Sequence, residues 1–396
     1  MRICHITPSL PPEYTAVATL PVCLGWLATA NGDEVQYISN PAPEDLLRRA
    51  AGEEMPGPVL RLPPQTRPDS MPLGVRTPAA VSAVARAILP HVRWADVLHM
   101  HGNTLLATSG ALVAELTGKP TVLTLYGTEI WEYQVRRWRP DLFTRAYRKA
   151  AHVAFYSQGL LTRAMELGLG RRNSTVIYPP VAHEFTFQDE GGQADARAAL
   201  GIRSRHVLVT VKRVDTLGGH RHLLEALSEI IRTHPDTRLV ICGTGPLIED
   251  VKAAARSWGV EGHVTFTGPL GAAAVARYDA AADAFVLASQ LDSCPTGALE
   301  ALACGTPVIA TDNPGGLEIR EIFGFDVTIV PRENPMALAR ALVHLFEAKR
   351  RVRASTIDVI DREFRPEQVF AQYRALYSDG VERAAKRTRK RQSKQG

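Results

Sequence analysis

The sequence predicts an α/β protein built from two Rossmann-like, doubly wound domains in tandem. Short apolar runs alternate with helical patterns from the first residue to "STVIYPP" at 174–180. This alternation is typical of a parallel sheet covered by helices. The polar segment 183–200 interrupts it, and the same alternation resumes at "HVLVTVKRV", residues 206–214. A chain of 396 residues is also long enough for two domains of ordinary size.

The first half is expected to supply short apolar strands joined by helices. One helix ends at Gly118 just before Pro120, which is a common way for a helix to stop. The segment 41–78 is rich in Pro and Gly and is expected to be irregular. The expected strands are 1–9, 34–39, 95–102, 120–129, 151–158 and 174–180, and the expected helices are 20–31, 78–92 and 104–118.

The second half repeats this pattern after the polar segment, which we interpret as a linker. The expected strands are 206–214, 238–243, 263–268, 283–289 and 307–311, and the expected helices are 221–234, 247–259, 272–281 and 297–305. The expected organisation is a first domain over 1–183, a second over 184–364, a helix over 365–380 that packs back on the first domain, and a basic tail over 381–396.

The positive charge of the chain belongs to its last sixteen residues. These hold seven Lys/Arg and one Glu, a net charge of +6, whereas the whole chain carries +5 and the rest therefore −1. Such a run is usually solvated and disordered, and contact with anionic lipid or another polyanion is the alternative. Five scattered cysteines, no signal peptide and no apolar run of membrane-spanning length favour a cytoplasmic protein, with the inner membrane face as a peripheral contact.

The stretch "QLDSCPTGALEALACGTPVIATDNPGG", residues 290–316, carries the clearest chemistry. A strand ends just before it, and open α/β sheets bind ligands at that edge. Thr296 and Gly297 lie where a helix begins, and free N–H groups there can cradle a phosphate. Asp292 and Glu300 flank the turn and could accept hydrogen bonds from sugar hydroxyls. The alternative is an ordinary strand-to-helix turn in which Glu300 serves only as an early-helix charge.

Residues after two neighbouring strands strengthen the ligand interpretation. Lys212 and Arg213 follow the first strand of the second domain, and the fixed fork of an arginine suits phosphate. Gly243 and Gly245, in "CGTGPL", follow another strand of the same domain. The simplest ligand for this edge is a nucleoside diphosphate.

With these motifs together, the chain resembles the retaining glycosyltransferases of family 4, which have the GT-B fold of two Rossmann-like domains facing a cleft. The family carries a glutamate, seven residues and a second glutamate, followed by a G-x-P-V strand and a Gly-Gly turn. Here that pattern reads Asp292, seven residues, Glu300 and "GTPVIATDNPGG". The resemblance extends to "VKRV", "CGTGPL" and "DAFVLAS" in the second domain, and to "DVLHMHG" and "LTLYGTE" in the first.

The resemblance implies a metal-independent enzyme that moves a hexose-type sugar from a nucleotide sugar, most simply a UDP- or GDP-sugar, to an acceptor hydroxyl with retention. Glu300 would bind the donor ribose and Asp292 the transferred sugar. Arg213 would bind the diphosphate together with the N–H groups around Thr296, Gly297 and Ala298. The acceptor, a glycan, a lipid-linked sugar or a small molecule, would be held by the first domain. No cofactor and no nucleic-acid partner is implied.

The sequence departs from the family pattern at four positions. The first acid is Asp292 instead of glutamate, and Gly218 stands where a lysine is expected five residues after Arg213. Thr15 and Ala16 replace the usual Gly-Gly of the first loop, and Tyr126 replaces the usual histidine.

The departures direct attention to nearby residues. The nearest substitutes for the missing lysine are Lys212, His220 and Arg221, with Lys212 expected to point away from Arg213 and to matter less. Gly218 and Gly219 would let phosphates approach the following helix. The candidate acceptor residues are Tyr14, Thr15, Tyr126 and Glu129.

Histidines near the end of strand 95–102 are a further candidate group. His99 and His101, taken as alternating residues, are expected on opposite faces of the sheet, so no metal site is predicted. His101 is the candidate catalytic residue nearer the ligand edge, with a structural role as the alternative. The segment 131–140, "WEYQVRRWRP", is interpreted as an amphipathic helix, with an acceptor site or a membrane-surface patch as alternatives.

Two other functions fit the same motifs. One is another GT-B enzyme, such as a sugar-nucleotide epimerase or a phosphorylase that requires free phosphate. The other is a catalytically weak nucleotide-sugar-binding partner protein, which would bind a donor without turnover.

Overall fold

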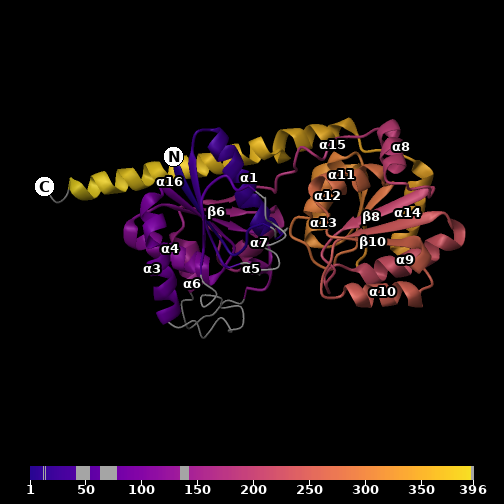
Figure 1. Ribbon diagram of the computed structural model, residues 1–396, viewed down its shortest axis with the longest axis horizontal. Coiled ribbons are helices and arrows are strands. Elements are labelled where there is room, and N and C mark those ends of the chain that lie inside the picture. Colours follow the sequence, from indigo (N-terminus) through magenta and orange to yellow (C-terminus); the bar gives the residue numbers. More distant parts are fainter. Residues whose placement is uncertain (12, 14, 42–53, 63–77, 134–141, 394–396) are drawn as a thin grey trace. The chain divides into compact units, whose positions relative to one another are not determined.

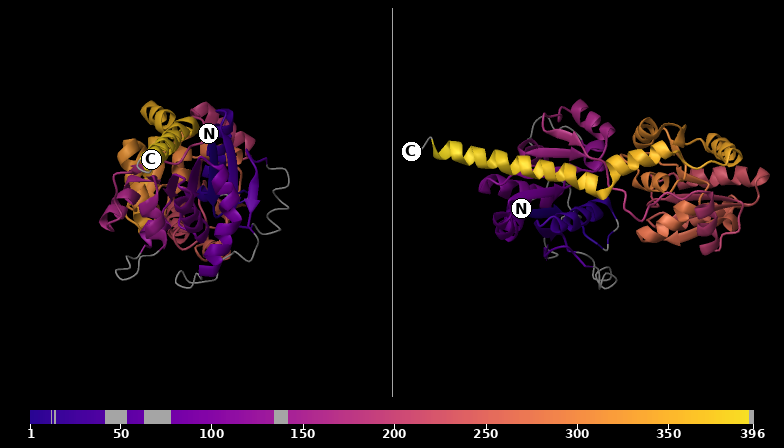
Figure 2. Two further views of the ribbon diagram at one scale, coloured as in Figure 1. Left: turned by 90° about the vertical axis from the view of Figure 1, so that its left-hand side faces the viewer. Right: turned by 90° about the horizontal axis from the view of Figure 1, so that it is seen from above.

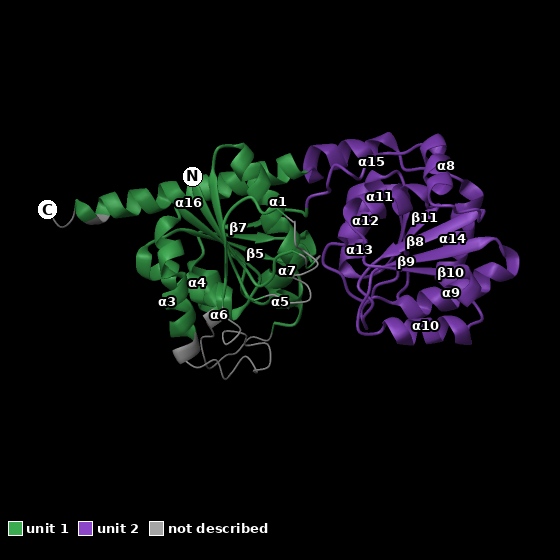
Figure 3. Ribbon diagram, viewed as in Figure 1, with its two compact units in different colours: residues 1–179, 366–396 green, residues 180–365 purple. Residues whose placement is uncertain are grey.

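The computed structural model describes all residues except 12, 14, 42–53, 63–77, 134–141 and 394–396. The chain forms two compact units (Figure 3). Unit 1 combines Met1–Pro179 with Pro366–Gly396, and unit 2 is Pro180–Arg365. The change of unit at Pro180 lies close to the boundary expected at 183. The polar segment that we interpreted as a linker belongs to unit 2, where Glu190–Ala199 forms helix α8.

Unit 1 contains a parallel sheet in the order β3-β2-β1-β4-β5-β6-β7. This is the 3-2-1-4-5-6 order of a doubly wound sheet with one more strand at the edge. The strands are β1 Arg2–Thr7, β2 Glu34–Ser39, β3 Val59–Arg61, β4 Val97–His101, β5 Thr121–Leu125, β6 His152–Phe155 and β7 Ser174–Val176. Strand β3 lies inside the segment expected to be irregular, because three residues without an alternating pattern give too weak a signal.

Helices cover both faces of this sheet. Alternate residues of each strand point to opposite faces, so Ile6 and Leu98 belong to one core and Ile3 and Val97 to the other. Helices α3, α4, α6 and α7 pack on the first face, and α1 and α16 pack on the second. The helices of this unit are α1 Ala16–Ala30, α3 Pro78–Trp94, α4 Leu105–Thr117, α5 Thr128–Trp131, α6 Leu142–Lys149, α7 Gln158–Glu166 and α16 Pro366–Gln392.

Unit 2 contains a parallel sheet in the order β10-β9-β8-β11-β12-β13, which is the 3-2-1-4-5-6 order of a dinucleotide-binding fold. Its strands are β8 His206–Val211, β9 Thr237–Cys242, β10 Val264–Gly268, β11 Ala284–Leu287, β12 Val308–Thr311 and β13 Val327–Val330. Its helices, besides α8, are α9 His220–Thr233, α10 Ile248–Ser257, α11 Ala272–Ala281, α12 Thr296–Ala303, α13 Pro314–Phe323, α14 Pro335–Ala348 and α15 Ala354–Val359. The order places β8 and β11, where the sheet changes direction, side by side.

Helix α16 returns from unit 2 and runs along unit 1 (Figure 1, Figure 2). Its side chains Val369, Phe370, Tyr373 and Tyr377 are buried in the second core of that unit. The structure therefore places this helix on unit 1, and it extends well beyond 380.

The expected disordered tail is instead helical as far as Gln392. The helix continues because the segment is made of Ala, Lys, Arg and Gln, which favour helices, together with acid-to-base pairs one turn apart. Asp379 pairs with Arg383 and Glu382 with Lys386. The expectation weighed the block of like charge and overlooked these pairs.

Truncation should separate the buried part of α16 from its exposed end. Deleting 366–396 removes several fully buried aromatic side chains, each contributing about 1.5–3 kcal/mol, so unit 1 should lose its cooperative unfolding transition. Deleting 382–396 removes residues that are mostly exposed where the structure describes them, and should change the free energy of unfolding by less than about 0.5 kcal/mol. Urea unfolding monitored by circular dichroism measures both. Equal stability of the two truncated proteins would contradict the packing described here.

Candidate functional site

The loops that follow β8, β9 and β11 meet at one edge of the unit 2 sheet. A Cβ atom at Gly219 would lie 1.8 Å from the carbonyl oxygen of Ala288. At Gly243 it would lie 2.3 Å from the oxygen of Lys212, and at Gly245 2.2 Å from that of Val214. The two glycines of "CGTGPL" therefore serve first to let the strand ends pack backbone against backbone. The residues proposed from the sequence for a phosphate site are collected at this edge.

Helix α12 begins at the same edge with free amide groups. Its N-cap, Pro295, offers no side-chain acceptor. The Ala298 N–H donates to the Pro295 carbonyl oxygen at 2.9 Å. The N–H groups of Thr296 and Gly297 have no acceptor among the described residues. A Cβ at Gly297 would lie 3.1 Å from the Val211 oxygen, which places this helix start against the end of β8.

Lys212 and Asp292 form an ion pair in this site. The Lys212 ammonium contacts the Asp292 carboxylate, and both side chains are mostly buried. Arg213 has a different partner: its side chain is 69% exposed, and its Nε lies 3.6 Å from Oδ2 of Asp215. Lys212 does point to a different partner from Arg213, as expected for consecutive residues. The long side chain of Lys212 nevertheless reaches Asp292 in the loop after β11.

Glu300 lies one turn into α12 and is partly exposed. Burial raises the pKa of its carboxyl to about 7. Nearby Asp279, on α11, is fully buried, and its carboxyl oxygens have no partner among the described residues. Burial, and then repulsion from Glu300, raise the pKa of Asp279 well above its ordinary value. Asp279 is therefore a neutral acid beside a titrating one, and the sequence analysis did not single it out.

The loop from Arg213 to the start of α9 contains Gly218, the position where the family pattern has a lysine. The Leu217 N–H donates to Asp215, and the Gln290 N–H donates to the Leu217 oxygen, which ties this loop to the one after β11. His220, the first residue of α9, is buried, whereas Arg221 is exposed. His220 and Arg221, two of the three candidate substitutes, therefore have opposite environments.

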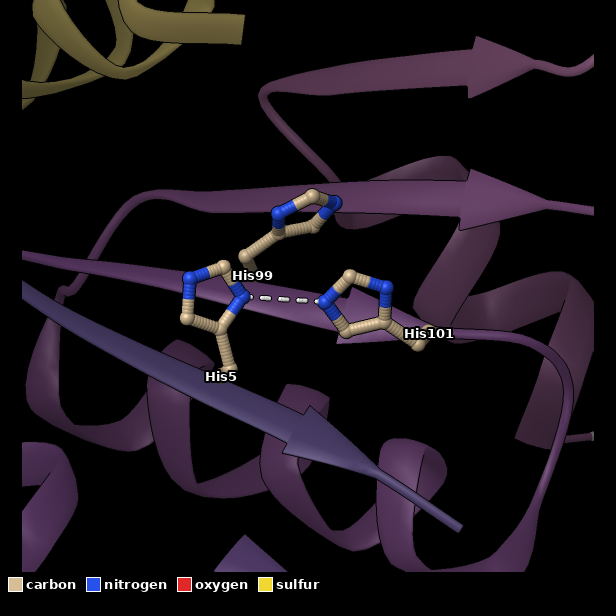
Figure 4. A group of neighbouring side chains, drawn as sticks. All are labelled: His5, His99 and His101. Atoms are coloured by element: carbon tan, nitrogen blue, oxygen red, sulfur yellow. Dashed lines mark hydrogen bonds between the residues drawn. The ribbon is translucent and has the colours of Figure 1, made fainter. Parts of the chain in front are cut away.

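In unit 1, three buried histidines form a cluster: His5 from β1, and His99 and His101 from β4 (Figure 4). The rings of His99 and His101 lie with centroids 4.0 Å apart. The expectation that they point to opposite faces is wrong, because residues two apart in a strand share a face. His5 Nδ1 lies 3.0 Å from His101 Nε2 (Figure 4).

Hydroxyl groups hold the outer nitrogens of this cluster. His99 contacts Tyr377 Oη through Nδ1 and Thr124 Oγ1 through Nε2, both at 2.7 Å. His101 Nδ1 lies 2.6 Å from Tyr126 Oη. The ring nitrogens are close enough for a metal ion, within 4.8 Å of one another. Both nitrogens of His99 are already held, however, so the arrangement fits a hydrogen-bonded network better than a set of metal ligands.

The candidate acceptor residues follow β5 and precede α1. The Glu129 carboxylate accepts the N–H of Gly127 at 2.8 Å and that of Tyr126 at 3.4 Å, and burial raises its pKa. Thr15 is exposed at the N-cap of α1. Tyr14 lies outside the described residues, as does most of the proposed amphipathic segment at 131–140. Tyr126, Glu129 and His101 are thus brought together in unit 1.

Two family models match the chain and together span most of it. A model described as "Glycosyl transferases group 1" matches residues 193–357, and one described as "Glycosyltransferase Family 4" matches residues 24–185. The chain belongs to glycosyltransferase family 4. The first model covers the motifs at the edge of the unit 2 sheet, and the second covers His99, His101 and the Tyr126 loop, whereas His5 lies outside it.

Curated family 4 members match over shorter segments. The chain is 34% identical over 173 residues to a GDP-mannose-dependent alpha-(1-6)-phosphatidylinositol monomannoside mannosyltransferase of Mycolicibacterium smegmatis, covering 42% of this chain and 45% of the relative. It is 34% identical over 169 residues to a D-inositol 3-phosphate glycosyltransferase of Segniliparus rotundus, covering 41% and 37%. The chain thus spans less than half the length of each of these relatives.

Solved structures match over nearly the whole chain. The Anabaena protein HepE, in complex with UDP and glucose, has a TM-score of 0.74 at 19% identity, covering 96% of this chain and 99% of that one. Sucrose-phosphate synthase from Thermosynechococcus elongatus has a TM-score of 0.74 at 20% identity, covering 96% and 98%. This likeness establishes the GT-B fold. Among the described helices, none is both long and apolar enough to cross a membrane.

The histidine cluster should make unit 1 sensitive to acid. Burial lowers the pKa of His5 to about 3 and those of His99 and His101 well below their ordinary value. The unfolded chain takes up these protons near pH 6.5, so the free energy of unfolding should fall below that pH by up to about 1.4 kcal/mol per pH unit for each histidine. Urea unfolding at pH 7 and pH 5 measures the loss.

A glutamine at position 5 should remove one third of this effect. His5→Gln should reduce the difference between pH 7 and pH 5 by up to about 2 kcal/mol. His344→Gln, a change at an exposed histidine of unit 2, is the matched control and should leave the difference unchanged. If His5→Gln unfolds with the wild-type pH dependence, then His5 is not neutral in the folded protein.

Proposed function

We propose that this family 4 member is a glycosyltransferase that moves a sugar from a nucleotide sugar to an acceptor hydroxyl, with retention of configuration. The observation that carries the proposal is the edge of unit 2 where α12 begins. The free N–H groups at the start of this helix lie near two acids, Asp292 and Glu300, and two cations follow β8. The Glu300 carboxylate has no hydrogen-bond partner among the described residues. Anion-binding and hydroxyl-binding groups in this order suit a diphosphate flanked by two sugars.

Each group has a distinct role in this proposal. The Thr296 and Gly297 amides and Arg213 bind the diphosphate, and Glu300 accepts hydrogen bonds from the ribose hydroxyls. Asp292, fixed by Lys212, accepts hydrogen bonds from the transferred sugar. Because Lys212 neutralises Asp292, the acid can lie near the diphosphate without repelling it.

The donor is proposed to be a UDP- or GDP-sugar. UDP is bound in the Anabaena structure, and the Mycolicibacterium relative is named for GDP-mannose. The acceptor is proposed to be a glycan, a lipid-linked sugar or a small molecule bound by unit 1, near Tyr126 and Glu129. The exposed basic end of α16 is a further proposed contact, with an anionic membrane surface.

The reaction needs no protein nucleophile in this proposal. The bond between the anomeric carbon and the phosphate oxygen breaks, and the acceptor oxygen bonds to that carbon on the same face. The acceptor's proton passes to an oxygen of the leaving diphosphate. Arg213 and the helix amides stabilise the charge that builds on the diphosphate, and the unit holds the groups in position. The chain itself supplies the positive charge that stabilises the leaving diphosphate, so the proposed reaction requires no metal ion.

A protein that binds the donor without transferring it is the second candidate. Gly218 favours it, because the diphosphate would lack the lysine that the family pattern places there. Turnover with a set of acceptors separates the two functions. An epimerase or phosphorylase has no separate support at this site.

The two acids should affect different steps. Glu300→Ala should weaken binding of plain UDP or GDP, since the ribose contact is lost. Asp292→Ala should leave that binding within about threefold and slow sugar transfer by at least about tenfold, or about 1.4 kcal/mol of barrier. Calorimetry with the nucleoside diphosphates and turnover with the sugar donor measure the two effects. Control of plain nucleotide binding by Asp292 alone would reverse the two roles.

Arg213 should be essential for transfer. One positive charge about 4 Å from the leaving group is worth roughly 4 kcal/mol at an effective dielectric constant of 20. Arg213→Ala should therefore lower kcat/KM at least about a hundredfold. Arg203→Ala is the matched control, because Arg203 is exposed and precedes β8 at the other end of the strand. Normal transfer by Arg213→Ala would place the diphosphate elsewhere.

A further inference from the structure

His220 fills the space where a side chain at position 218 would begin. A Cβ atom at Gly218 would lie 2.5 Å from His220 Cε1 and 2.6 Å from His220 Nδ1. No side chain fits there while the imidazole keeps its place, because real Cβ atoms do not approach other atoms so closely. The glycine that replaces the expected lysine and the histidine two residues later are therefore spatially linked.

The imidazole of His220 is buried and unsatisfied. The residue is 3% exposed, and neither ring nitrogen has a hydrogen-bond partner among the described residues. Buried polar atoms are usually hydrogen-bonded, so this ring lacks a partner that a ligand could supply. It is also the first residue of α9, a helix of 14 residues whose N-cap, Gly219, offers no side chain. The free N–H groups at such a helix start attract anions.

The other candidate cations are less suited to the role. The Lys212 ammonium is already paired with Asp292. Arg221 is exposed on the surface of α9, one residue after the buried His220. His220 is therefore the only one of the three candidates that is both unpaired among the described residues and buried at the helix start.

We propose that His220 replaces the missing lysine and binds a phosphate of the donor as the imidazolium, taking up one proton from water or buffer when the nucleotide binds. This inference rests on the proposed function, because it requires a diphosphate at this edge. No covalent bond is made or broken in the step. The proton moves from the solvent to the ring, and a phosphate oxygen accepts the resulting N–H hydrogen bond.

The charges around the imidazole of His220 favour the neutral ring before the nucleotide binds and the protonated ring after it binds. In the free protein, burial and then the Lys212 ammonium lower the pKa of His220 to about 4, against a smaller opposite effect of Asp215. The ring is therefore neutral before binding at neutral pH. An adjacent phosphate adds negative charge and favours the protonated form. Binding that takes up a proton weakens as pH rises, by up to about tenfold per pH unit.

Calorimetry with plain UDP and GDP tests the proton. Titrations at pH 7 in two buffers of different ionisation enthalpy give the number of protons taken up per nucleotide. Wild type should take up more protons than His220→Gln, by up to about one. Glu300, whose pKa burial raises to about 7, and the nucleotide phosphates also exchange protons. Their contribution is common to both proteins and cancels in the difference.

The pH dependence separates this role from a structural one. The affinity lost in His220→Gln should be about tenfold at pH 6 and should nearly vanish at pH 8. A merely structural role would cost the same affinity at both values. His222→Gln, a change in the same helix turn, is the matched control and should behave as wild type. Equal proton uptake by wild type and His220→Gln would overturn the proposal.

A paired substitution keeps the test valid if His220→Gln folds poorly. Gly218→Lys alone should weaken nucleotide binding, because its Cβ meets the imidazole. Gly218→Lys combined with His220→Val should bind UDP or GDP more tightly than either single variant and take up no extra proton. If the losses of affinity in the two single variants simply add in the double variant, then a lysine at position 218 cannot take the place of His220, and the proposal is overturned. Failure of wild type to bind any nucleoside diphosphate would instead overturn the proposed function itself.

Discussion

Backbone packs directly against backbone where β8, β9 and β11 end in unit 2. At Gly219, Gly243 and Gly245 a Cβ atom would lie within 2.3 Å of a carbonyl oxygen, closer than any real contact. The close packing brings the loops after these strands to the start of α12. The close packing also determines which side chains can face a ligand. Lys212, Arg213 and Asp292 all lie in the loops whose positions it sets. The chemistry of the edge depends on this packing before it depends on any single charge.

Much of this arrangement follows from local sequence. Apolar runs of four to eight residues alternating with helical patterns predict parallel strands, and the carboxyl ends of such strands meet at one edge. The sequence alone therefore predicts one site for Asp292, Thr296, Gly297 and Glu300. Their place after a strand and at the start of a helix was the decisive signal.

Other features depend on contacts between distant residues, which no local pattern contains. Asp279 reads as an ordinary polar position of an amphipathic helix, yet it is fully buried. The pairing of Lys212 with Asp292 joins residues 80 positions apart. His99 and His101 could have been placed correctly, since residues two apart share a strand face, but the third member, His5, comes from another strand.

Both units contain buried polar groups that lack a hydrogen-bond partner among the described residues. In unit 1, His99 and His101 contact hydroxyl groups of Thr124, Tyr126 and Tyr377. Nε2 of His5 and the hydroxyl group of Ser39 are buried there without a partner among the described residues. In unit 2, Asp279 and His220 are buried without partners among the described residues. Unsatisfied groups cost stability, and proteins tolerate them most often at functional sites. What distinguishes His220 is its place at the start of α9, where both of its ring nitrogens lack a partner in the part of the chain that the structure describes.

The division of the chain has a consequence for how it folds during synthesis. Unit 1 begins with the first residue and is completed only by α16, while all of unit 2 lies between these two segments. The ribosome therefore releases every residue of unit 2 before the buried tyrosines of α16 emerge. Until then the second core of unit 1 is open on the face that α16 later covers. Unit 1 thus starts before unit 2 and is completed after it, and its exposed apolar surface is a natural target for chaperones while unit 2 folds.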